Sequence, residues 1–367
     1  MKENPGSSKV HILSMQRVMN FGSVLQAWSL RQLVEELSGR QVTFLDIDAE
    51  MVIPSGREHS EAVNYDVPAC YPPGILQKAK RRCIRYLSAY NKHLIRKFMK
   101  NELKLEEAGL LETQDLVIIG SDEVFNHARG INLQLHGNVA GAKRVATYAA
   151  SCGSALPQDV RPEDRETVRS ALENIERISV RDAVTERYIA ELTGRKTLHH
   201  LDPVLVGSLP ARKRRKVWLK KYLLVYAYGQ RIRAEKEIKA IQAFARDRGL
   251  KIVAVGGSQF WCDLYIPASP MRLLDYFHSA DYVVTDTFHG SIFSVINHKK
   301  FAVIVRPTNC GKISGLLEDL GLTERLLPDM EVLEKTLVPE IDYQRIDAIL
   351  AVERERTRAY LRELLEE

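Results

Sequence analysis

The segment 281–296, D-Y-V-V-T-D-T-F-H-G-S-I-F-S-V-I, contains a histidine, His289, close to the acidic residue Asp286 and the hydroxyl residue Thr287. The apolar residues up to Thr285 predict a buried strand. Asp286, Thr287 and His289 would follow the carboxyl end of that strand, where open α/β sheets bind their ligands. A histidine in this position is suited to act as an acid, a base or a hydrogen-bond donor to phosphate near neutral pH.

The same segment predicts a helix that begins at about Gly290. The backbone N–H groups of Gly290 and Ser291 would then lie at a helix N-terminus, which attracts anions. A glycine there lets the backbone come close to a ligand. The alternative is an ordinary strand-to-helix turn with Asp286 as the helix cap, and the pattern alone favours neither interpretation.

A second polar cluster, Gly120-Ser-Asp-Glu-Val-Phe-Asn126, also follows a predicted strand directly. Its side chains are suited to hold hydroxyl groups of a ligand. Ser121 or Asp122 would equally serve as the cap of a following helix, and by pattern alone capping is the commoner role.

Two further turns carry polar residues. In Asn20-Phe-Gly-Ser23 the serine is three residues before Gln26, which predicts a capping box with the helix starting at Ser23. Arg181 ends another predicted strand and is suited to bind a carboxylate or phosphate through two parallel hydrogen bonds. An ion pair with Asp182 or Glu186 is the simpler alternative.

The charge of this 367-residue chain is unevenly distributed, with a formal net value of +6. Residues 78–100 carry nine Lys/Arg and residues 212–221 carry seven, and neither segment has an Asp or Glu. Without these two segments the chain would be acidic. A general nucleic-acid binder would spread its basic residues over a broad surface with aromatic residues between them, so two local patches point to a specific anionic partner or a membrane surface.

The first basic segment predicts a long helix with two faces. The apolar face is predicted to comprise Leu76, Ala79, Cys83, Leu87, Tyr90, Leu94 and Phe98, and the basic face Lys78, Arg82, Arg85, Lys92, Arg96 and Lys100. Such a helix can lie on an anionic membrane. It can also pack its apolar face on the domain and leave the other face in water, which is the commoner case.

The composition, with 45% hydrophobic and 27% charged residues, is typical of a globular enzyme. Five widely spaced cysteines without a CxxC pair argue against disulfides and structural zinc, and the N-terminus has no secretory pattern, so we expect a cytoplasmic location. The Walker, GxGxxG, HExxH and GxSxG signatures are absent. We therefore expect no metal and no bound cofactor.

Apolar strands alternate with amphipathic helices twice along the chain, which predicts an α/β protein with mostly parallel sheets. The two series are separated by the second basic segment. We expect an N-terminal α/β domain at 1–206 that includes the basic helix at about 75–100, a C-terminal α/β domain at 207–340, and a final helix at 341–367.

Six segments together resemble the polysaccharide pyruvyl transferase family, and they occur in the family's order through most of the chain. They are Asn20-Phe-Gly-Ser-Val-Leu-Gln26, Gly120-Ser-Asp-Glu-Val-Phe-Asn126, Tyr148-Ala-Ala-Ser-Cys-Gly153, Ser179-Val-Arg-Asp182, Leu201-Asp-Pro203 and Thr285-Asp-Thr-Phe-His-Gly290. One position departs from the pattern, because Lys312 stands where many relatives carry an arginine. A lysine keeps the positive charge but loses the bidentate fork.

The resemblance implies two Rossmann-like domains that face each other across a cleft, in an architecture similar to that of GT-B glycosyltransferases. It also implies transfer of the enolpyruvyl group of phosphoenolpyruvate to a sugar, which forms a pyruvate ketal in an exopolysaccharide or cell-envelope glycan and releases phosphate. The donor site would lie on the C-terminal domain and the acceptor site on the N-terminal domain.

The implied roles fall on residues already singled out. His289 would be the general acid, or the donor that stabilises the phosphate, and Asp286 would orient it. The donor would be bound by Arg181, Thr287, Gly290, Ser291 and Lys312, and the acceptor by Asn20, Ser23, Ser121, Asp122 and Asn126. The rival functions are a nucleotide-sugar-dependent glycosyltransferase of the same fold, a non-catalytic glycan-binding or anion-binding protein, and a nucleic-acid binder.

Overall fold

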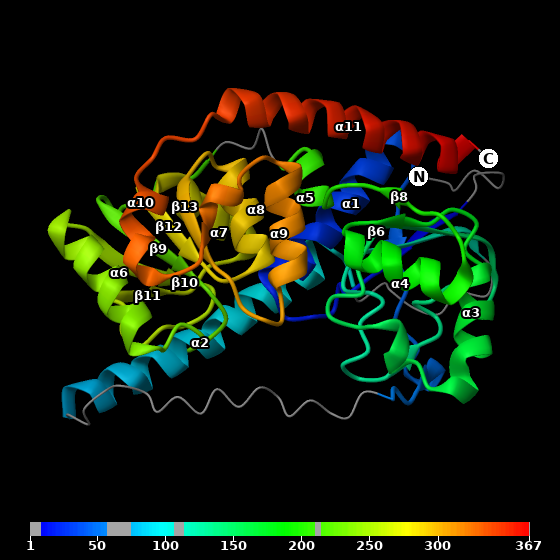
Figure 1. The fold of residues 1–367 in the computed structure, drawn as a ribbon, viewed down its shortest axis with the longest axis horizontal. Helices are drawn as coiled ribbons and strands as arrows, with labels where there is room; N and C mark the ends of the chain where they lie inside the picture. The colour runs from blue at the N-terminus through cyan, green and yellow to red at the C-terminus, as the bar shows by residue number, and fades with distance from the viewer. Residues whose placement is uncertain (1–8, 57–74, 106–113, 210–213, 367) are drawn as a thin grey trace. The chain divides into compact units, whose positions relative to one another are not determined.

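The computed structural model describes residues 9–56, 75–105, 114–209 and 214–366 (Figure 1). The chain folds into two compact units. Unit 1 combines residues 1–62, 99–211 and 348–367, and unit 2 combines residues 63–98 and 212–347. The units are therefore not consecutive in sequence, as the predicted domains were, because the long helices α2 (Ile75–Asn101) and α11 (Tyr343–Glu366) each contribute residues to both.

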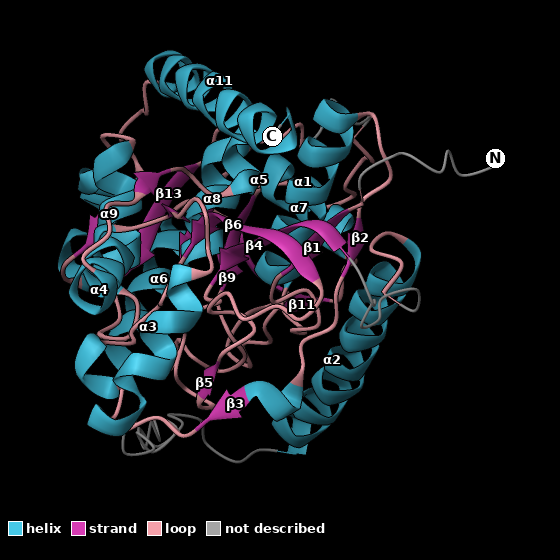
Figure 2. Cartoon of the chain, turned by 90° about the vertical axis from the view of Figure 1, so that its right-hand side faces the viewer, coloured by secondary structure: helices cyan, strands magenta, loops and turns pink. Residues whose placement is uncertain are grey.

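Unit 1 is built on a parallel sheet of six strands (Figure 2). The strands are, in spatial order, β2 (Thr43–Phe44), β1 (Val10–Leu13), β4 (Gln114–Asp122), β6 (Ala142–Ala150), β7 (Ser179–Val180) and β8 (Leu198–His199). The chain builds outward in one direction from β1 and in the other from β4, so the order reverses between these two strands. In such sheets the ligand crevice lies at the carboxyl ends of the strands where the order reverses.

The helices of unit 1 cover this sheet because each has a buried apolar face. They are α1 (Phe21–Ser38), α3 (Arg165–Glu173), α4 (Ala183–Thr193), the short α5 (Pro203–Val206) and the C-terminal part of α11. A small antiparallel pair, β3 (Val52–Ile53) with β5 (Ile131–Asn132), is separate from the main sheet. Short 3-10 turns lie at Ala49–Met51, Pro157–Asp159 and Pro162–Asp164.

Unit 2 repeats the design with a second parallel sheet of six strands. Their order is β11 (Leu264–Ile266), β10 (Lys251–Val255), β9 (Tyr222–Tyr226), β12 (Tyr282–Thr285), β13 (Lys300–Ile304) and β14 (Leu326–Leu327). Here the order reverses between β9 and β12. The helices are α6 (Glu235–Asp247), α7 (Pro270–Ser279), α8 (Phe288–Ile296), α9 (Cys310–Asp319) and α10 (Leu333–Leu337), with 3-10 turns at Thr323–Arg325 and Met330–Val332.

The two doubly wound sheets confirm the predicted fold class, an α/β chain with two Rossmann-like domains. The strands have continuous apolar runs because helices cover both faces of a parallel sheet. For example, Tyr222–Tyr226 is buried along its whole length. No described helix is long and apolar enough to span a lipid bilayer.

The basic helix α2 packs on unit 2 through a different face from the one predicted. Its buried residues are Ile84, Asn91, Ile95, Phe98 and Met99, with Leu87 and Leu94 partly buried, whereas Ala79, Cys83 and Tyr90 are exposed. The side chain of Leu76 lies outside the described residues. The error comes from Asn91, which the hydrophobic pattern counted as polar. Its side-chain oxygen accepts the N–H of Ala268, so a polar residue belongs to the packed face.

Candidate functional site

In unit 2, Asp286 directly follows β12 at the point where the strand order reverses, and its carboxylate forms ion pairs with two arginines. Its Oδ2 atom is 3.2 Å from Nε of Arg306 and 3.3 Å from Nε of Arg231. Arg306 follows β13, and Arg231 lies in the loop after β9. The ends of three neighbouring strands therefore meet in one charged cluster.

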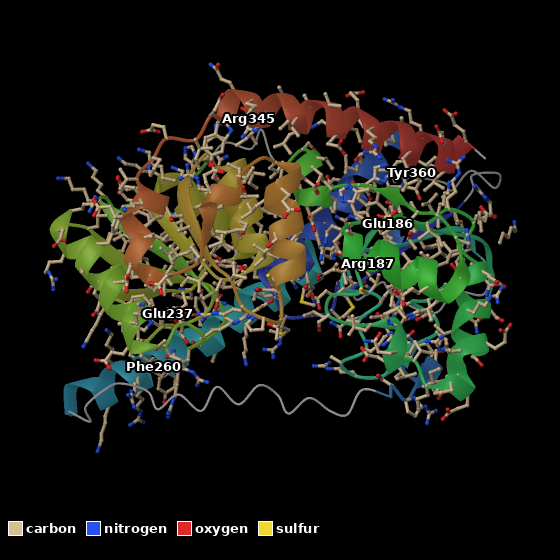
Figure 3. The ribbon with its side chains drawn as sticks, viewed as in Figure 1. Glu186, Arg187, Glu237, Phe260, Arg345 and Tyr360 are labelled. Carbon is tan, nitrogen blue, oxygen red and sulfur yellow. The ribbon has the colours of Figure 1, made fainter. Side chains whose placement is uncertain are left out.

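Arg306 also binds Glu237, which lies on α6 (Figure 3). Nη1 and Nη2 of Arg306 donate to the two carboxylate oxygens of Glu237 at 2.6 and 3.2 Å, the bidentate geometry that suits arginine. Burial lowers the pKa of Arg306, but hydrogen bonds and charge attraction from Glu237 and Asp286 outweigh it, so the pKa is raised. Burial raises the pKa of Asp286 in spite of both arginines.

Sequence reasoning missed Arg231 and Arg306. It expected Asp286 to orient His289, whereas the ion pairs of the Asp286 carboxylate go to these two arginines. One signal for Arg306 was present, since it directly follows the apolar run 301–305 and lies two residues beyond the end of β13. Arg231 had no such signal, because it lies five residues beyond the end of β9.

Helix α8 begins at Phe288, two residues before the predicted start, and Thr287 is its N-cap. The Thr287 hydroxyl accepts the N–H of Gly290 at 3.0 Å, and the Thr287 carbonyl accepts the N–H of Ser291 at 3.2 Å. The two amides predicted to face an anion are therefore used inside the helix. The helix start was predicted two residues too late, and Asp286, the cap in the alternative interpretation, lies one residue before the observed cap.

Gly290 is required for packing. A Cβ atom at this position would overlap the side chain of Thr285, whose hydroxyl donates to the Tyr226 carbonyl at 2.6 Å. The first turn of α8 can therefore lie against β12 only if residue 290 has no side chain. This contact explains the glycine without any ligand.

His289, in the first turn of α8, is 8% exposed. Its ring lies 5.3 Å from the ring of Phe288 and 6.0 Å from that of Phe293, measured between centroids. The imidazole is therefore among aromatic rings, a few residues from the charged cluster around Asp286. Its role as acid or phosphate donor stays a prediction.

Lys312 lies in the first turn of α9 and is partly buried. The helix start is tied to the charged cluster by Asn309, whose side-chain N–H donates to the Asp286 carbonyl at 2.8 Å and whose oxygen accepts the N–H of Arg306 at 3.1 Å. Lys312 thus belongs to the same end of the sheet as Asp286. Its part in donor binding stays a prediction.

In unit 1, Asp122 ends β4 at the corresponding reversal point and accepts a hydrogen bond from Ser23 of α1. The Ser23 Oγ to Asp122 Oδ2 distance is 2.6 Å, and both residues are buried. Asp122 has a φ of 76°, a conformation that is uncommon for non-glycine residues. No cap forms here, since the residues that follow Asp122 are turns rather than a helix.

The predicted capping box at Ser23 and Gln26 is absent, because α1 begins at Phe21 and Asn20 is its cap. The Asn20 side-chain oxygen accepts the N–H of Gly22 at 2.8 Å. Gln26 instead donates to the hydroxyl of Ser14, at the end of β1, at 2.9 Å. Ser23 therefore has no capping task, and its hydroxyl is directed to Asp122.

Ser121 belongs to the framework beneath Asp122. The residue is completely buried, its hydroxyl donates to the Ala149 carbonyl at 3.0 Å, and its own carbonyl accepts the Ser14 hydroxyl at 3.0 Å. The peptide bond between Gly120 and Ser121 is cis. These contacts join the ends of β1, β4 and β6.

Asn126 is partly buried and pairs with Glu123. Its side-chain N–H donates to Glu123 Oε2 at 2.7 Å. Gly153, in the turn after β6, has a φ of 63°, and a Cβ atom there would lie 2.6 Å from Glu123 Oε2 and 2.8 Å from Asn126 Nδ2. The glycine of the Tyr148–Gly153 segment thus makes room for the Glu123–Asn126 pair of the neighbouring segment.

Arg181 is buried in unit 1 and forms an ion pair with Asp202, a partner that the sequence did not suggest. Nη1 of Arg181 donates to Asp202 Oδ2 at 2.9 Å. Burial lowers the pKa of Arg181, but the attraction of Asp202, Asp122, Asp182 and Glu123 outweighs it and raises the pKa. Asp182 is the N-cap of α4, where it accepts the N–H of Thr185.

The sequence-predicted residues therefore fall into two groups. One group lies in unit 1 and comprises Asn20, Ser23, Ser121, Asp122, Asn126 and Arg181. The other lies in unit 2 and comprises Asp286, Thr287, His289, Gly290, Ser291 and Lys312. Arg181 was expected in the donor set, but it belongs to the same unit as the acceptor set, where Asp202 links it to Ser121 at 3.5 Å.

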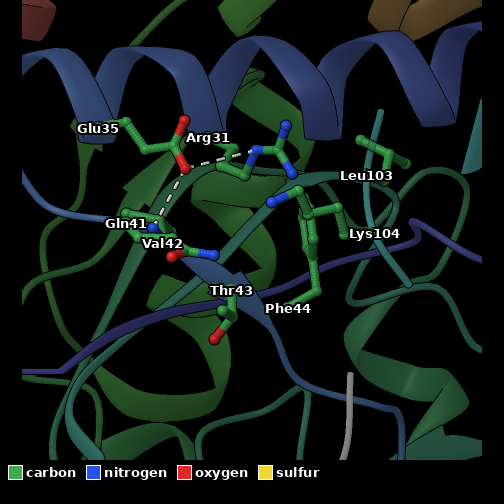
Figure 4. A pocket seen from close by; sticks show the side chains of 8 residues that line it. All are labelled: Arg31, Glu35, Gln41, Val42, Thr43, Phe44, Leu103 and Lys104. Carbon is green, nitrogen blue, oxygen red and sulfur yellow. Dashed lines mark hydrogen bonds and ion pairs between the residues drawn. The ribbon is translucent and has the colours of Figure 1, made fainter. Parts of the chain in front are cut away.

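A small cavity of about 140 Å³ lies elsewhere in unit 1, between α1, the residues 41–44 and the residues 103–104 (Figure 4). Glu35 stands at its rim, where its Oε1 accepts the N–H of Val42 at 3.2 Å and lies 3.8 Å from Nε of Arg31. None of the predicted site residues lines this cavity. Within the described ranges, no group of three or more His, Cys, Asp or Glu has the arrangement of a metal site.

Comparison with solved structures finds several sugar-active enzymes. The glycosyltransferase SnogD from Streptomyces nogalater has 14% identity and a TM-score of 0.40, with 99% of this chain and 96% of that chain covered. The UDP-GlcNAc 2-epimerase of Methanocaldococcus jannaschii, in complex with UDP-GlcNAc and UDP, has 11% identity and a TM-score of 0.47, with 94% and 99% covered. A comparison with curated proteins finds no match.

The family model for polysaccharide pyruvyl transferase matches residues 20–307. The match includes both reversal points, from Asn20 in unit 1 to Arg306 in unit 2. It leaves out Lys312, the position at which the chain departs from the motif pattern. The chain belongs to the polysaccharide pyruvyl transferase family.

Proposed function

We propose that the protein transfers the enolpyruvyl group of phosphoenolpyruvate to a sugar of a glycan or glycan precursor and forms a pyruvate ketal. The observation that carries the proposal is the family match over residues 20–307, whose motif segments lie at strand ends along the carboxyl edge of each sheet, the reversal points among them. Sheets of this type bind their ligands at these points. The transferase class follows from the family, and the donor, the ketal and the acceptor are proposed.

The reaction needs one protonation, one addition of a hydroxyl and one displacement of phosphate by a second hydroxyl. A proton is added to the CH₂ carbon of phosphoenolpyruvate, and the neighbouring carbon becomes an oxocarbenium-like centre. One sugar hydroxyl adds to that centre and loses its proton. A second hydroxyl then displaces phosphate and loses its proton, so that the products are the cyclic ketal and inorganic phosphate, with atoms and charge balanced.

His289 is the proposed proton donor, either to the CH₂ carbon or to the leaving phosphate. A positioned acid or base of this kind contributes about 10²–10⁴-fold to a rate. Lys312, at the same end of the unit 2 sheet, is proposed to attract the donor as a point charge, since it lacks the planar fork of arginine.

The Ser23–Asp122 pair is proposed to receive the acceptor. Asp122 is a carboxylate at the carboxyl end of β4, and carboxylates accept hydrogen bonds from sugar hydroxyls. The Ser23 hydroxyl donates a hydrogen bond of 2.6 Å to Asp122 Oδ2, which orients this carboxylate. Asn126 and Asn20 lie on neighbouring turns of the same unit and are proposed to define the acceptor's orientation.

Phosphoenolpyruvate is an intracellular metabolite, so we propose that the enzyme acts in the cytoplasm on precursors of an exopolysaccharide or cell-envelope glycan. We also propose that α2 makes peripheral contact with an anionic membrane. Its residues Arg82, Arg85, Lys92, Arg96 and Lys97 are exposed and form no ion pair with any carboxylate in the described parts of the chain. Each basic residue near such a surface contributes about 1 kcal/mol.

The decisive experiment incubates the purified protein with phosphoenolpyruvate and a panel of nucleotide-linked and lipid-linked sugars. Release of inorganic phosphate together with the mass gain of a pyruvate ketal would establish the function. Transfer of a sugar from a UDP-sugar or GDP-sugar, with no response to phosphoenolpyruvate, would instead establish a glycosyltransferase. Binding of glycans without turnover of either donor would place the chain among non-catalytic binding proteins.

A further inference from the structure

Arg231 has hydrogen-bonding capacity that the chain does not use. A guanidinium has five N–H donors. The contacts of Arg231 are Nε with Asp286 at 3.3 Å, Nη2 with the Thr308 hydroxyl at 3.2 Å, and the face of the Tyr228 ring at 5.2 Å. Across the described part of the chain, Nη1 of Arg231 has no acceptor, although the side chain is only 10% exposed.

The carboxylates of Glu237 and Asp286 contact Arg306 more than they contact Arg231. Arg306 takes both oxygens of Glu237 and also the closer contact with Oδ2 of Asp286, at 3.2 Å. Oδ1 of Asp286 has no hydrogen bond, although the residue is completely buried. All three guanidinium nitrogens of Arg306 therefore contact a carboxylate of Glu237 or Asp286. Arg231 has one carboxylate contact, at 3.3 Å, with the Asp286 oxygen that Arg306 also contacts.

The place of this arginine suits a ligand. The ends of β9 and β12 are where the strand order of the unit 2 sheet reverses. Tyr228, whose ring lies against Arg231, is 51% exposed, so solvent reaches this side of the cluster. The first turn of α8 follows β12 and that of α9 follows the neighbouring strand β13, and helix N-termini carry partial positive charge.

We propose that Arg231 is the anchor of a phosphate-binding subsite, and that Asp286 and Arg306 are the residues that position it. A phosphate group offers paired oxygens that match the planar fork of arginine. The identification of the ligand as phosphoenolpyruvate rests on the proposed function, whereas the subsite itself does not. A nucleoside diphosphate offers the same chemistry, so the test includes both.

The test measures binding by isothermal titration calorimetry on the full chain, with phosphoenolpyruvate, inorganic phosphate and UDP as separate probes. The variants are Arg231→Gln and Arg231→Lys. The matched control is Arg246→Gln, which makes the same change on the exposed surface of α6. Thermal unfolding of each variant establishes that it is folded.

We expect Arg231→Gln to weaken binding of at least one probe tenfold or more, Arg231→Lys to recover part of the loss, and Arg246→Gln to bind within twofold of the parent. Sensitivity to UDP alone would support the subsite and count against phosphoenolpyruvate as donor. A folded Arg231→Gln variant that binds every probe like the parent would overturn the inference, even if ketal formation is intact. Failure of the parent to bind any probe would overturn it too.

Discussion

Arg181 and Asp202 form a buried ion pair at the carboxyl edge of the unit 1 sheet, with side chains 3% and 0% exposed. The sequence suggested Arg181 as a ligand for the donor. In the structure its positive charge balances Asp202 and lies near Asp122, Asp182 and Glu123. The arginine therefore holds together the acidic framework on which Asp122 is placed.

Arg181→Ala should destabilise the fold rather than change donor binding alone. Removing one partner of a buried pair leaves the other charge uncompensated, which costs about 3–5 kcal/mol. Urea unfolding at neutral pH measures the loss, and Arg169→Ala, at an exposed pair with Glu173, is the control that should unfold near the parent midpoint. A stable Arg181→Ala variant with a raised donor KM would restore the original assignment.

Asp122→Asn should lower activity with little change in stability, because the amide keeps the size of the carboxylate and still accepts the Ser23 hydroxyl. Ser23→Ala should raise the KM for the acceptor and leave the KM for the donor unchanged. Steady-state kinetics with each substrate varied in turn separates the two effects. Ser170→Ala, on the exposed side of α3, is the matched control. Equal changes in both KM values would argue against an acceptor site here.

His289→Ala should reduce kcat by about 10²-fold or more while the protein remains folded, as expected for loss of a general acid or base. His298→Ala is the control, since His298 is an exposed histidine of the same unit. Phosphate release in single-turnover experiments measures the chemical step directly. Near-parental turnover by His289→Ala would remove this residue from the mechanism.

The stability of the protein should fall as the pH drops below about 6.5. Burial lowers the pKa of His136 to about 3 and that of His200 to about 4, from an ordinary value of 6.5. At low pH these histidines are protonated in the unfolded chain but not in the folded one. Each therefore lowers the free energy of unfolding by about 2 kcal/mol at about pH 5 and leaves it unchanged above about pH 7.5. Urea midpoints across this range measure the effect, and unchanged midpoints would contradict it.

If α2 contacts membranes, the triple reversal of Arg82, Arg85 and Lys92 to Glu should release the protein from vesicles that contain phosphatidylserine. Reversing Lys220, Arg246 and Lys335, which are exposed elsewhere in unit 2, alters the net charge equally and should have a smaller effect. Tyr86 and Tyr90, 66% and 54% exposed on the same helix, should respond by fluorescence on binding. Cosedimentation of the parent with neither anionic nor neutral vesicles would end the proposal.

The sequence predicted the strands and most helix bounds because apolar runs and amphipathic periods are local signals. The basic helix expected at about 75–100, for example, spans Ile75–Asn101. Contacts between distant residues were less accessible. Nothing near Ser23 shows that its hydroxyl would bind a carboxylate 99 residues away rather than cap its own helix.

The candidate site was found through its motifs and misread in its details for the same reason. Gly290 was interpreted as an approach point for a ligand, whereas it accommodates Thr285 across the strand–helix turn. Asp286 was paired with the nearest histidine in sequence, although its partners come from the ends of β9 and β13. Local spacing placed these residues at the carboxyl edge of each sheet, and only the tertiary fold selected their partners.

The return of α11 to unit 1 has a consequence for biosynthesis. The last helix is bound there by Arg354 to the Val206 carbonyl at 3.0 Å and by the Tyr360 hydroxyl to the Thr147 carbonyl at 2.7 Å. A nascent chain therefore cannot complete unit 1 until the residues of α11 have left the ribosome. Unit 2, whose residues end at 347, can close first, so the usual order in which the N-terminal domain matures before the C-terminal one is reversed.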